Sequence, residues 1–296
     1  MRRRTFLQHG SLLAAATALG ACGKPRPDHP VGYQLYSVRD AMAEDALATV
    51  RALLDMGFTH FEAYGYDATA DTLYGLSPKQ LRRELDALGT RLTSAHFGFA
   101  DYARAPLDEL RAYTDECLSC AEALDMRYLV WPVLRDADRT ADGFKRVAER
   151  LSIIGEHLAG SGRGIAFHNN GGEFADLGGG LRGYDIVLAE ADPAVKLELD
   201  MYWLAHDGAA ETPAELIARD PARFVMWHVK DMHPASRDYT ELGAGTIAYP
   251  TLLPDIDASG LEFLYLEQGG NFAATSMESA AVNAAYWQAT LAQHVR

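Results

Sequence analysis

Residues 195–200 read VKLELD and residues 224–231 read FVMWHVKD, with a helix-like stretch, Pro213–Ala218, between them. Both runs have the composition of buried strands, and both end in side chains that can bind a metal or move a proton. A strand, a helix and a second strand in this order predict two parallel strands joined by a crossover helix. The same unit recurs along the chain in both directions.

Eight strand-like runs follow residue 30, and helix-like segments separate them. The runs are Val31–Tyr36, Phe58–Tyr64, Arg91–Phe97, Tyr128–Val133, Gly164–His168, Val195–Leu199, Phe224–Val229 and Phe263–Leu266. Segments with apolar residues at helical spacing include Ala43–Met56, Ser77–Leu88, Leu107–Leu124, Ala141–Leu158, Gly183–Glu190, Pro213–Ala218 and Tyr249–Ala258.

This alternation predicts the α/β class and a single (β/α)8 TIM barrel over residues 31–296. Eight units of about 33 residues each match the usual size of such a barrel. An open doubly wound sheet is the alternative, but no glycine-rich phosphate loop follows the first run. We therefore expect one catalytic domain, with its site at the carboxyl ends of the strands.

The N-terminal residues differ in composition from this domain. Arg3 and Arg4 precede an apolar run, Gly10–Leu19, that is too short for a permanent membrane span. This arrangement resembles a twin-arginine export signal. We predict a signal peptide at residues 1–21 and a periplasmic location.

Residues 19–22 read LGAC and resemble the lipobox at which bacterial lipoproteins are cut and acylated. This motif predicts lipidation at Cys22, a lipid anchor as the only membrane contact, and a proline-containing tether over residues 22–30. A secreted protein without a lipid is the alternative.

The charge of the chain argues against nucleic-acid partners. The formal net charge is −14, from 27 basic and 41 acidic residues. Residues 1–21 hold three arginines and no acid, so their removal leaves 24 minus 41, or −17. Such a surface repels phosphate backbones. The sequence does not fix the oligomeric state, and a homo-oligomer stays open.

Two cysteines lie in the predicted barrel domain. Cys117 and Cys120 are three residues apart in a helix-like segment, which places both on one face. We expect them to pack in the core, because a redox pair or a zinc site would require partners that the neighbouring sequence does not supply.

Polar side chains stand where the strands are expected to end. Four of them, His168, Asp200, His228 and Glu267, follow consecutive runs, so they are expected to converge on one centre. Taken singly, His228 is compatible with a hydrogen-bonded core histidine and Asp200 with a helix cap. Together, two imidazoles and two carboxylates predict one divalent metal. Mixed nitrogen and oxygen donors favour Mn²⁺, with Zn²⁺, Co²⁺, Fe²⁺ or Mg²⁺ as alternatives.

Several motifs resemble those of the xylose isomerase-like sugar phosphate isomerase/epimerase superfamily, and the resemblance covers nearly everything after residue 30. The motifs are QLYS at 34–37, HNN at 168–170 followed by EF at 173–174, LD at 199–200 with Trp203, WHVKD at 227–231, GAG at 243–245 and LEQ at 266–268. The resemblance implies metal-assisted removal of a proton beside a sugar carbonyl. The superfamily includes ketose 3-epimerases, inosose dehydratases and 3-keto-glycoside lyases.

The chain departs from the ketose 3-epimerases in this superfamily, whose four ligands are Glu, Asp, His and Glu. His168 stands at the first of these positions, and Asn170 stands where the family has a second histidine. The two glutamates of the epimerases shuttle protons on opposite faces of the sugar. Losing one of them makes a two-base epimerisation depend on a substitute, for which Glu62, His96 and Glu198 are the candidates.

The remaining polar and aromatic residues near the strand ends have predicted roles as well. Glu267 is expected to act as ligand and base, with His96 or Glu62 as a second acid or base and Lys230 as a donor to a substrate oxygen. A surface ion pair between Lys230 and Asp231 is the alternative for that lysine. Glu198 is expected one layer deeper, paired with a basic neighbour. The substrate-binding candidates are Gln34, Tyr64, Trp131, Asn169, Trp203 and Lys230.

The predicted function is a divalent-metal-dependent isomerase, epimerase or lyase acting on an unphosphorylated small-molecule carbohydrate, because phosphorylated sugars are chiefly cytoplasmic. An oxidised 3-keto-glycoside fits a single base, since its ketone acidifies C2 and permits loss of the C1 substituent. A noncatalytic periplasmic sugar-binding lipoprotein is the alternative. An endonuclease-like relative is a further alternative that the acidity disfavours.

Overall fold

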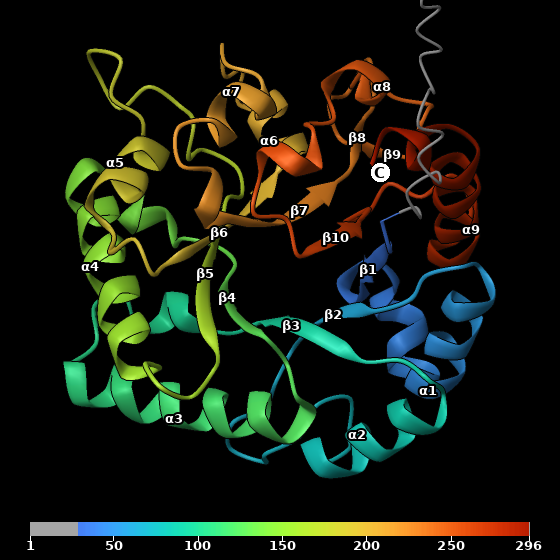
Figure 1. Cartoon of the computed structure of the whole chain (residues 1–296), viewed down its shortest axis with the longest axis horizontal. Helices are drawn as coiled ribbons and strands as arrows, with labels where there is room; N and C mark the ends of the chain where they lie inside the picture. The colour runs from blue at the N-terminus through green and yellow to red at the C-terminus, as the bar shows by residue number, and fades with distance from the viewer. Residues whose placement is uncertain (1–28, 296) are drawn as a thin grey trace, which may run out of the picture.

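Eight parallel strands close into a barrel in the computed structural model, which describes residues 29–295. Each strand pairs with its neighbour along the chain, and the last pairs with the first (Figure 1). The strands are β1 (Gly32–Gln34), β2 (Phe61–Tyr64), β3 (Leu92–His96), β4 (Tyr128–Trp131), β5 (Gly164–His168), β6 (Lys196–Asp200), β7 (Phe224–Val229) and β10 (Phe263–Leu266). The predicted fold, a single (β/α)8 TIM barrel, is confirmed.

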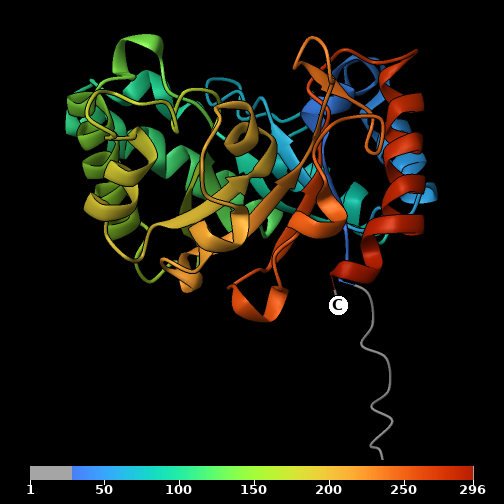
Figure 2. The ribbon, with the colours of Figure 1, turned by 90° about the horizontal axis from the view of Figure 1, so that it is seen from above.

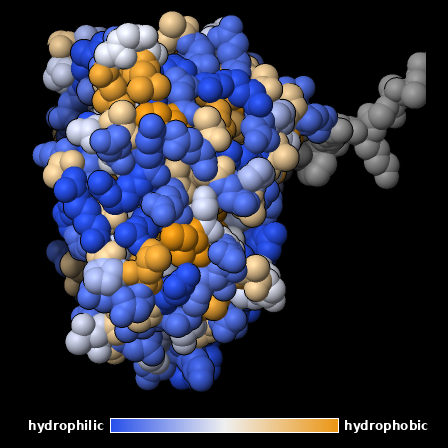
Figure 3. Space-filling model, turned by 90° about the vertical axis from the view of Figure 1, so that its left-hand side faces the viewer, coloured by the Kyte–Doolittle hydropathy of each residue, from blue (hydrophilic) through white to orange (hydrophobic). Residues whose placement is uncertain are grey.

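Helices follow the strands and surround the barrel. They are α1 (Arg39–Asp55), α2 (Pro78–Ala87), α3 (Leu107–Leu124), α4 (Ala141–His157), α5 (Gly183–Glu190), α6 (Met201–His206), α7 (Pro213–Ile217), α8 (Tyr249–Leu252) and α9 (Ser276–Tyr286). Two views at right angles place α4 and α9 on opposite sides of the strands (Figures 1 and 2). The face on the α4 side is mainly hydrophilic, with small groups of apolar residues (Figure 3).

Four elements differ from the prediction. The helices α6 and α9 were not among the predicted segments, nor was the two-stranded ribbon of β8 (Asp231–Met232) and β9 (Tyr239–Thr240). Tyr249–Ala258 is not one helix, because α8 ends at Leu252 and a 3-10 turn covers Ile256–Ala258. Pro254 explains this break, since it lacks an amide hydrogen and disfavours the helical conformation of the residue before it.

The apolar core lies mainly between the strands and the helices. Along each strand, alternate side chains point outward into this layer, as Leu129 and Trp131 of β4 do. A smaller cluster packs inside the barrel and includes Tyr128, Val130 and Tyr265. In α3, Cys117 and Cys120 are fully buried and unbridged, so the prediction of core packing is confirmed. Burial raises the pKa of the Cys120 thiol to about 12.

The barrel interior is more polar than expected. Strand interiors of a TIM barrel are usually apolar, but Gln34, Glu62, Ser94 and Glu198 are all fully buried there. Hydrogen bonds compensate their burial: Gln34 Nε2 donates to Glu62 Oε2 at 2.7 Å, and Ser94 Oγ donates to Glu62 Oε1 at 2.6 Å. This polar layer supports the residues at the strand ends above it.

The predicted signal peptide at residues 1–21, the lipidation site Cys22 and most of the predicted tether lie outside the described residues. Within residues 29–295, no helix combines the length and hydrophobicity needed to cross a bilayer.

Candidate active site

A cavity of about 860 Å³ opens at the carboxyl ends of the strands. Its walls come from the loops that follow the strands, as expected for a TIM barrel. Of the predicted site residues, six line it: Tyr64, His96, His168, Trp203, Lys230 and Glu267. The cavity has a volume typical of sites for small molecules.

Beside this cavity, four predicted ligands meet. One donor atom from each of His168, Asp200, His228 and Glu267 lies within 4.8 Å of the others. The register brings them together, because Asp200 of β6 pairs with His228 of β7. His228 Nδ1 lies 2.7 Å from Glu267 Oε2, and His168 Nε2 lies 3.3 Å from Asp200 Oδ2.

The four atoms share a second property. His168 Nε2, Asp200 Oδ2, His228 Nδ1 and Glu267 Oε2 are buried and have no hydrogen bond of acceptable geometry within the described residues. Buried polar atoms are normally satisfied. These four compensate one another through ion-pair contacts and through Lys230 Nζ, and because they converge they offer four donors to a single cation. Two imidazole nitrogens and two carboxylate oxygens fit a divalent transition metal.

Two of these ligands, His168 and Asp200, are oriented by hydrogen bonds to the atoms that do not face the cluster. Pro132 O lies 2.9 Å from His168 Nδ1, so His168 donates there and Nε2 keeps its lone pair. Asp200 Oδ1 accepts from the amides of Tyr202 and Trp203 at the start of α6. Asp200 is therefore a helix cap and a potential ligand at once, because Oδ2 stays available.

The side chain of Asn169 holds the backbone of the same aspartate. Asn169 Nδ2 donates to Asp200 O and Asp200 N donates to Asn169 Oδ1, both at 2.9 Å. Asn169 is fully buried and does not line the cavity, so its predicted role in substrate binding is wrong. It is a positioning residue for Asp200.

We expect Asn169→Ala to weaken Mn²⁺ binding about 10- to 100-fold, as loss of a group that orients a ligand typically does. Isothermal titration of the metal-free protein with Mn²⁺ measures this affinity. Asn170→Ala is the matched control, because the neighbouring Asn170 bonds only to the amide of Gly171 and should leave metal affinity unaltered. Equal affinities in both variants would contradict the assignment.

The second ring nitrogen of His228 points into the polar layer. His228 Nε2 lies 2.7 Å from Glu62 Oε2 and 3.1 Å from Glu198 Oε1. A carboxylate that accepts from a ligating histidine fixes its ring and strengthens its donor atom. Although burial disfavours the charged form, Glu198 and Glu62 raise the pKa of His228 well above its usual range.

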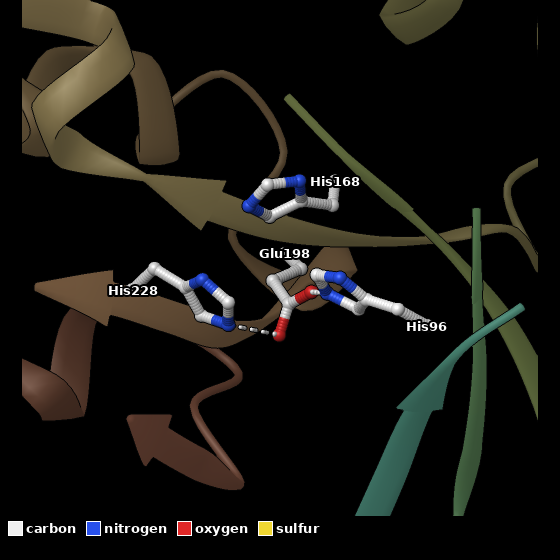
Figure 4. A group of neighbouring side chains, drawn as sticks. All are labelled: His96, His168, Glu198 and His228. Atoms are coloured by element: carbon white, nitrogen blue, oxygen red, sulfur yellow. Dashed lines mark hydrogen bonds and ion pairs between the residues drawn. The ribbon is translucent and has the colours of Figure 1, made fainter. Parts of the chain in front are cut away.

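His96 contacts the same two glutamates and lines the cavity. Figure 4 shows His96 beside Glu198. His96 Nε2 lies 3.0 Å from Glu62 Oε2 and 3.2 Å from Glu198 Oε2. Burial opposes protonation, but the two carboxylates raise the pKa of His96 to about 9. His96 is therefore an imidazolium at neutral pH, which makes it a proton donor.

His96, His168, Glu198 and His228 form a second cluster with donor atoms within 4.8 Å (Figure 4). It shares His168 and His228 with the first cluster, and the two ring nitrogens that lack a hydrogen bond, His168 Nε2 and His228 Nδ1, are the ones that belong to the first cluster. Its other histidine nitrogens already contact carboxylates: His96 Nε2 contacts Glu198, and His228 Nε2 contacts Glu62. The first cluster is therefore the better metal site, and the two cannot be filled together through His168.

Lys230 is buried between two of the candidate ligands. Its Nζ lies 2.6 Å from Asp200 Oδ2 and 2.8 Å from Glu267 Oε2. The pair with Asp231 that we considered does not form; Asp231 instead accepts from backbone amides, including Gly243 N. Although burial disfavours charge, Asp200 and Glu267 raise the pKa of Lys230. Although burial opposes ionisation, Lys230 and His228 hold the pKa of Glu267 well below its usual range.

Three further predictions need correction. Trp131 is fully buried, donates its indole N–H to Val133 O and stacks on Phe99, because alternation along β4 turns it toward the helices. Gln34 does not bind substrate, since it is buried beneath the cavity on Glu62. Glu62 lies in the same layer, so it cannot touch a substrate as acid or base and supports His96 and His228 instead.

The remaining assignments fit the geometry in part. Glu198 lies one layer below Asp200 and is paired with two basic neighbours, the histidines His96 and His228, as predicted. The prediction missed the tyrosines that line much of the cavity. They are Tyr36, Tyr66, Tyr102, Tyr113 and Tyr239. Tyr36 belongs to the QLYS motif, Tyr66 follows β2, Tyr102 and Tyr113 lie in a 3-10 turn and in α3, and Tyr239 lies in β9. No pattern in the sequence singled out the last four.

Glu173, in the loop after β5, is fully buried outside the cavity. Its nearest cation, Arg139 Nη1, is 3.7 Å from Oε1. Burial raises the pKa of Glu173 to about 7 despite this arginine. The native state thus holds a proton on Glu173 that the unfolded chain releases near pH 4.5.

This raised pKa predicts that stability contributed by the protonated form is lost as pH rises through about 7. We expect Glu173→Gln to increase the free energy of unfolding at pH 8 by roughly 2–3 kcal/mol relative to its effect at pH 5. Urea unfolding at the two pH values measures this difference, with exposed Glu149→Gln as the control. A Glu173→Gln effect independent of pH would refute it.

Comparisons with known proteins agree with this architecture. A family described as xylose isomerase-like TIM barrel matches residues 50–281. Among solved structures, a sugar phosphate isomerase/epimerase from Parabacteroides distasonis is similar, with a TM-score of 0.76 and 22% identity over 95% of this chain and 100% of that chain. No curated protein matches the chain in sequence.

Two other solved structures are similar at lower identity. An L-ribulose 3-epimerase has a TM-score of 0.63 and 16% identity, covering 89% of this chain and 94% of that chain. The IolI protein, solved with a zinc atom bound, has a TM-score of 0.62 and 12% identity, covering 87% and 97%. At these identities the likeness is one of fold.

Proposed function

Because the chain belongs to the xylose isomerase-like TIM-barrel family, we propose that it is a metal-dependent enzyme that removes a proton next to the carbonyl group of an unphosphorylated sugar. One observation carries this proposal. Four buried donor atoms, from His168, Asp200, His228 and Glu267, converge beside a cavity of suitable size. Two imidazole nitrogens and two carboxylate oxygens that meet at one point form a donor set suited to a divalent transition metal.

The donor set supports Mn²⁺, Fe²⁺, Co²⁺ or Zn²⁺ over Ca²⁺, which recruits more oxygens, and over Mg²⁺, which seldom takes two histidines. We propose Mn²⁺ as the native ion. When bound, such an ion stabilises negative charge that develops on a substrate oxygen. His168 and His228 would hold it through nitrogen, and Asp200 and Glu267 through oxygen.

Three side chains that line the cavity supply the proton chemistry. Glu267 is the ionised carboxylate at the cavity wall and accepts the proton from carbon. His96, protonated at neutral pH, donates a proton to a substrate oxygen. Lys230 donates a hydrogen bond to a second substrate oxygen, and its ammonium holds Glu267 in place until the sugar arrives.

The charges in the cavity support an unphosphorylated substrate. Among the described lining residues, Lys230 is the only lysine or arginine, and Asp200 and Glu267 already neutralise it. Asp67 adds negative charge to the wall, and Asp101 is paired with Arg135, which does not line the cavity. A phosphate group would therefore meet carboxylates rather than a cluster of arginines.

After proton removal, two outcomes are open to the same residues. Return of a proton gives isomerisation or epimerisation, and loss of a substituent on the neighbouring carbon gives elimination. With His168 in place of a second opposed glutamate, one base and one acid remain. We propose an oxidised 3-keto-glycoside as substrate, because elimination from it needs one base and one acid.

Export of the folded protein with its metal already bound would suit this chemistry. We propose that the twin-arginine signal at residues 1–21 carries the folded protein, so that Mn²⁺ binds in the cytoplasm before copper or zinc in the periplasm can compete. Lipidation at Cys22 would then anchor the enzyme to the membrane. Mass spectrometry of the mature protein tests the acylated cysteine directly.

The decisive experiment is proton exchange. Metal-loaded protein is incubated with free ketoses and with 3-keto-glycosides in deuterated water, and NMR follows the substrate C–H signals and the products. We expect exchange next to the carbonyl, its loss after chelation and its recovery on adding Mn²⁺. A protein that holds one metal ion yet exchanges no C–H proton with any of these sugars is not the proposed enzyme.

A further inference from the structure

The cavity is larger and more aromatic than the metal centre requires. We propose that it contains a second binding site, the aromatic chamber, which holds an uncharged ring linked to the reacting sugar. The chamber is lined by Tyr66, Phe97, Tyr102 and Tyr113 together with Asp67 and Asp101. This inference rests on the proposed function and names the part of the substrate that the metal centre does not reach.

The barrel topology separates the two sites. The candidate metal ligands stand at the ends of β5, β6, β7 and β10. The chamber residues come from the loops after β2 and β3 and from α3, on the other half of the barrel. His96, at the end of β3, lies between them: its ring centroid is 4.9 Å from that of His168, and the next residue, Phe97, belongs to the chamber.

The rings of the chamber are fixed before any ligand binds. Tyr102 and Tyr113 stack with centroids 4.3 Å apart and an interplanar angle of 11°. Tyr66 meets Phe97 edge to face at 5.8 Å. Gly98 N donates to Tyr113 Oη at 2.8 Å, and Tyr66 donates its hydroxyl to Asp71. Fixed aromatic surfaces bind a ring at low cost in conformational entropy.

The charges of the chamber define the class of ring. Asp67 and Asp101 are acceptors for hydroxyl groups. Asp101 is neutralised by Arg135, and Asp67 Oδ1 accepts from the amides of Thr69 and Ala70. No lysine or arginine is among the described residues that line this part of the cavity. The site therefore suits a second sugar or a phenolic ring and disfavours an anionic group.

The position of His96 gives this ring a chemical role as leaving group. Glu267 takes the proton from C2 of the 3-keto sugar, the C1–O bond breaks, and its electron pair stays on the oxygen of the departing ring. His96 donates a proton to that oxygen. The products are an unsaturated keto sugar and the free alcohol or phenol, so atoms and charge balance without an oxidant or reductant.

The test compares three 3-keto-glucosides that differ only at C1: methyl, phenyl and glucosyl. NMR in deuterated water measures kcat/KM for C2 proton exchange and for release of the C1 group. We expect Tyr102→Ala to lower the kcat/KM of ring-bearing substrates relative to the methyl glucoside about tenfold. Tyr102→Phe keeps the ring and should keep the wild-type ratio. Phenoxide is a better leaving group than methoxide in every variant, so comparing the ratio of kcat/KM values between variants removes this difference.

If Tyr102→Ala lowers the kcat/KM of the glucosyl substrate relative to the methyl glucoside, the occupant of the chamber is a second sugar. If it lowers the kcat/KM of the phenyl substrate in the same way, the occupant is a phenolic ring. An unchanged ratio for both rings in Tyr102→Ala overturns the chamber, while turnover of the methyl glucoside keeps the proposed function. If none of the three substrates reacts with the metal-loaded protein, the proposed function itself fails. Tyr102 is only partly buried, so its truncation should leave the fold intact.

Discussion

Replacing Glu267 with glutamine is expected to slow exchange of the substrate C–H proton by about 10³-fold or more. The carboxylate is the only base in the proposed scheme, and an amide oxygen cannot accept the proton. Glutamine keeps the size of the side chain and one oxygen toward the metal site. NMR in deuterated water measures the exchange rate, and elemental analysis of the same sample reports the metal content.

The matched control lies at the other end of the same strand. Glu262 directly precedes β10 and Glu267 directly follows it, and Glu262 lies outside the cavity on the hydroxyl of Tyr128. Glu262→Gln should exchange protons at the wild-type rate. A noncatalytic sugar-binding protein would behave differently: sugar affinity would survive Glu267→Gln, and neither variant nor wild type would exchange a proton.

The sequence was sufficient to predict the barrel because its strands and helices alternate with little interruption. All eight strand-like runs contain or overlap an observed strand, and the order of pairing follows from parallel strands joined by crossovers. The sequence did not predict where individual short helices begin and end. The break after α8 depends on Pro254, and α6 is a single short helix whose start is set by the Asp200 cap.

The candidate metal site was predictable for a related reason. Parallel strands present their carboxyl ends at one rim, so His168, Asp200, His228 and Glu267 had to converge once the strands were placed. It was harder to predict whether a side chain at a strand end points into the barrel or toward the helices. Trp131 stands near a strand end like the ligands, but it falls on the outward parity of β4 and packs against Phe99.

The polar layer beneath the site and the aromatic chamber could be recognised only from the three-dimensional structure. Gln34, Glu62 and Glu198 support the site only because they meet inside the barrel, a relation among residues far apart in the sequence. The chamber depends on loop conformation, which periodicity does not report. Tyr102 and Tyr113 stack across a 3-10 turn and the helix α3, and nothing in their sequence spacing distinguishes them from core residues.

His96→Gln is expected to lower kcat/KM by about 10²-fold or more, because it removes the proton donor. In the wild type, activity should fall as pH rises, since His96 must be protonated to donate and its pKa is about 9. Positive charge at the neighbouring metal site lowers this pKa, so the alkaline limb belongs at or below pH 9. The variant should lose that limb. A pH profile of kcat/KM for both proteins measures it.

His157→Gln separates this effect from a general response to losing a histidine. His157 lies at the end of α4 in an ion pair with Asp115, away from the cavity, so its replacement should preserve both the rate and the alkaline limb. If His96→Gln kept the limb, another group would be the acid, and Lys230 would be the next candidate because it also lines the cavity. The pH profile distinguishes the two, since Glu267 and Asp200 hold the pKa of Lys230 above that of His96.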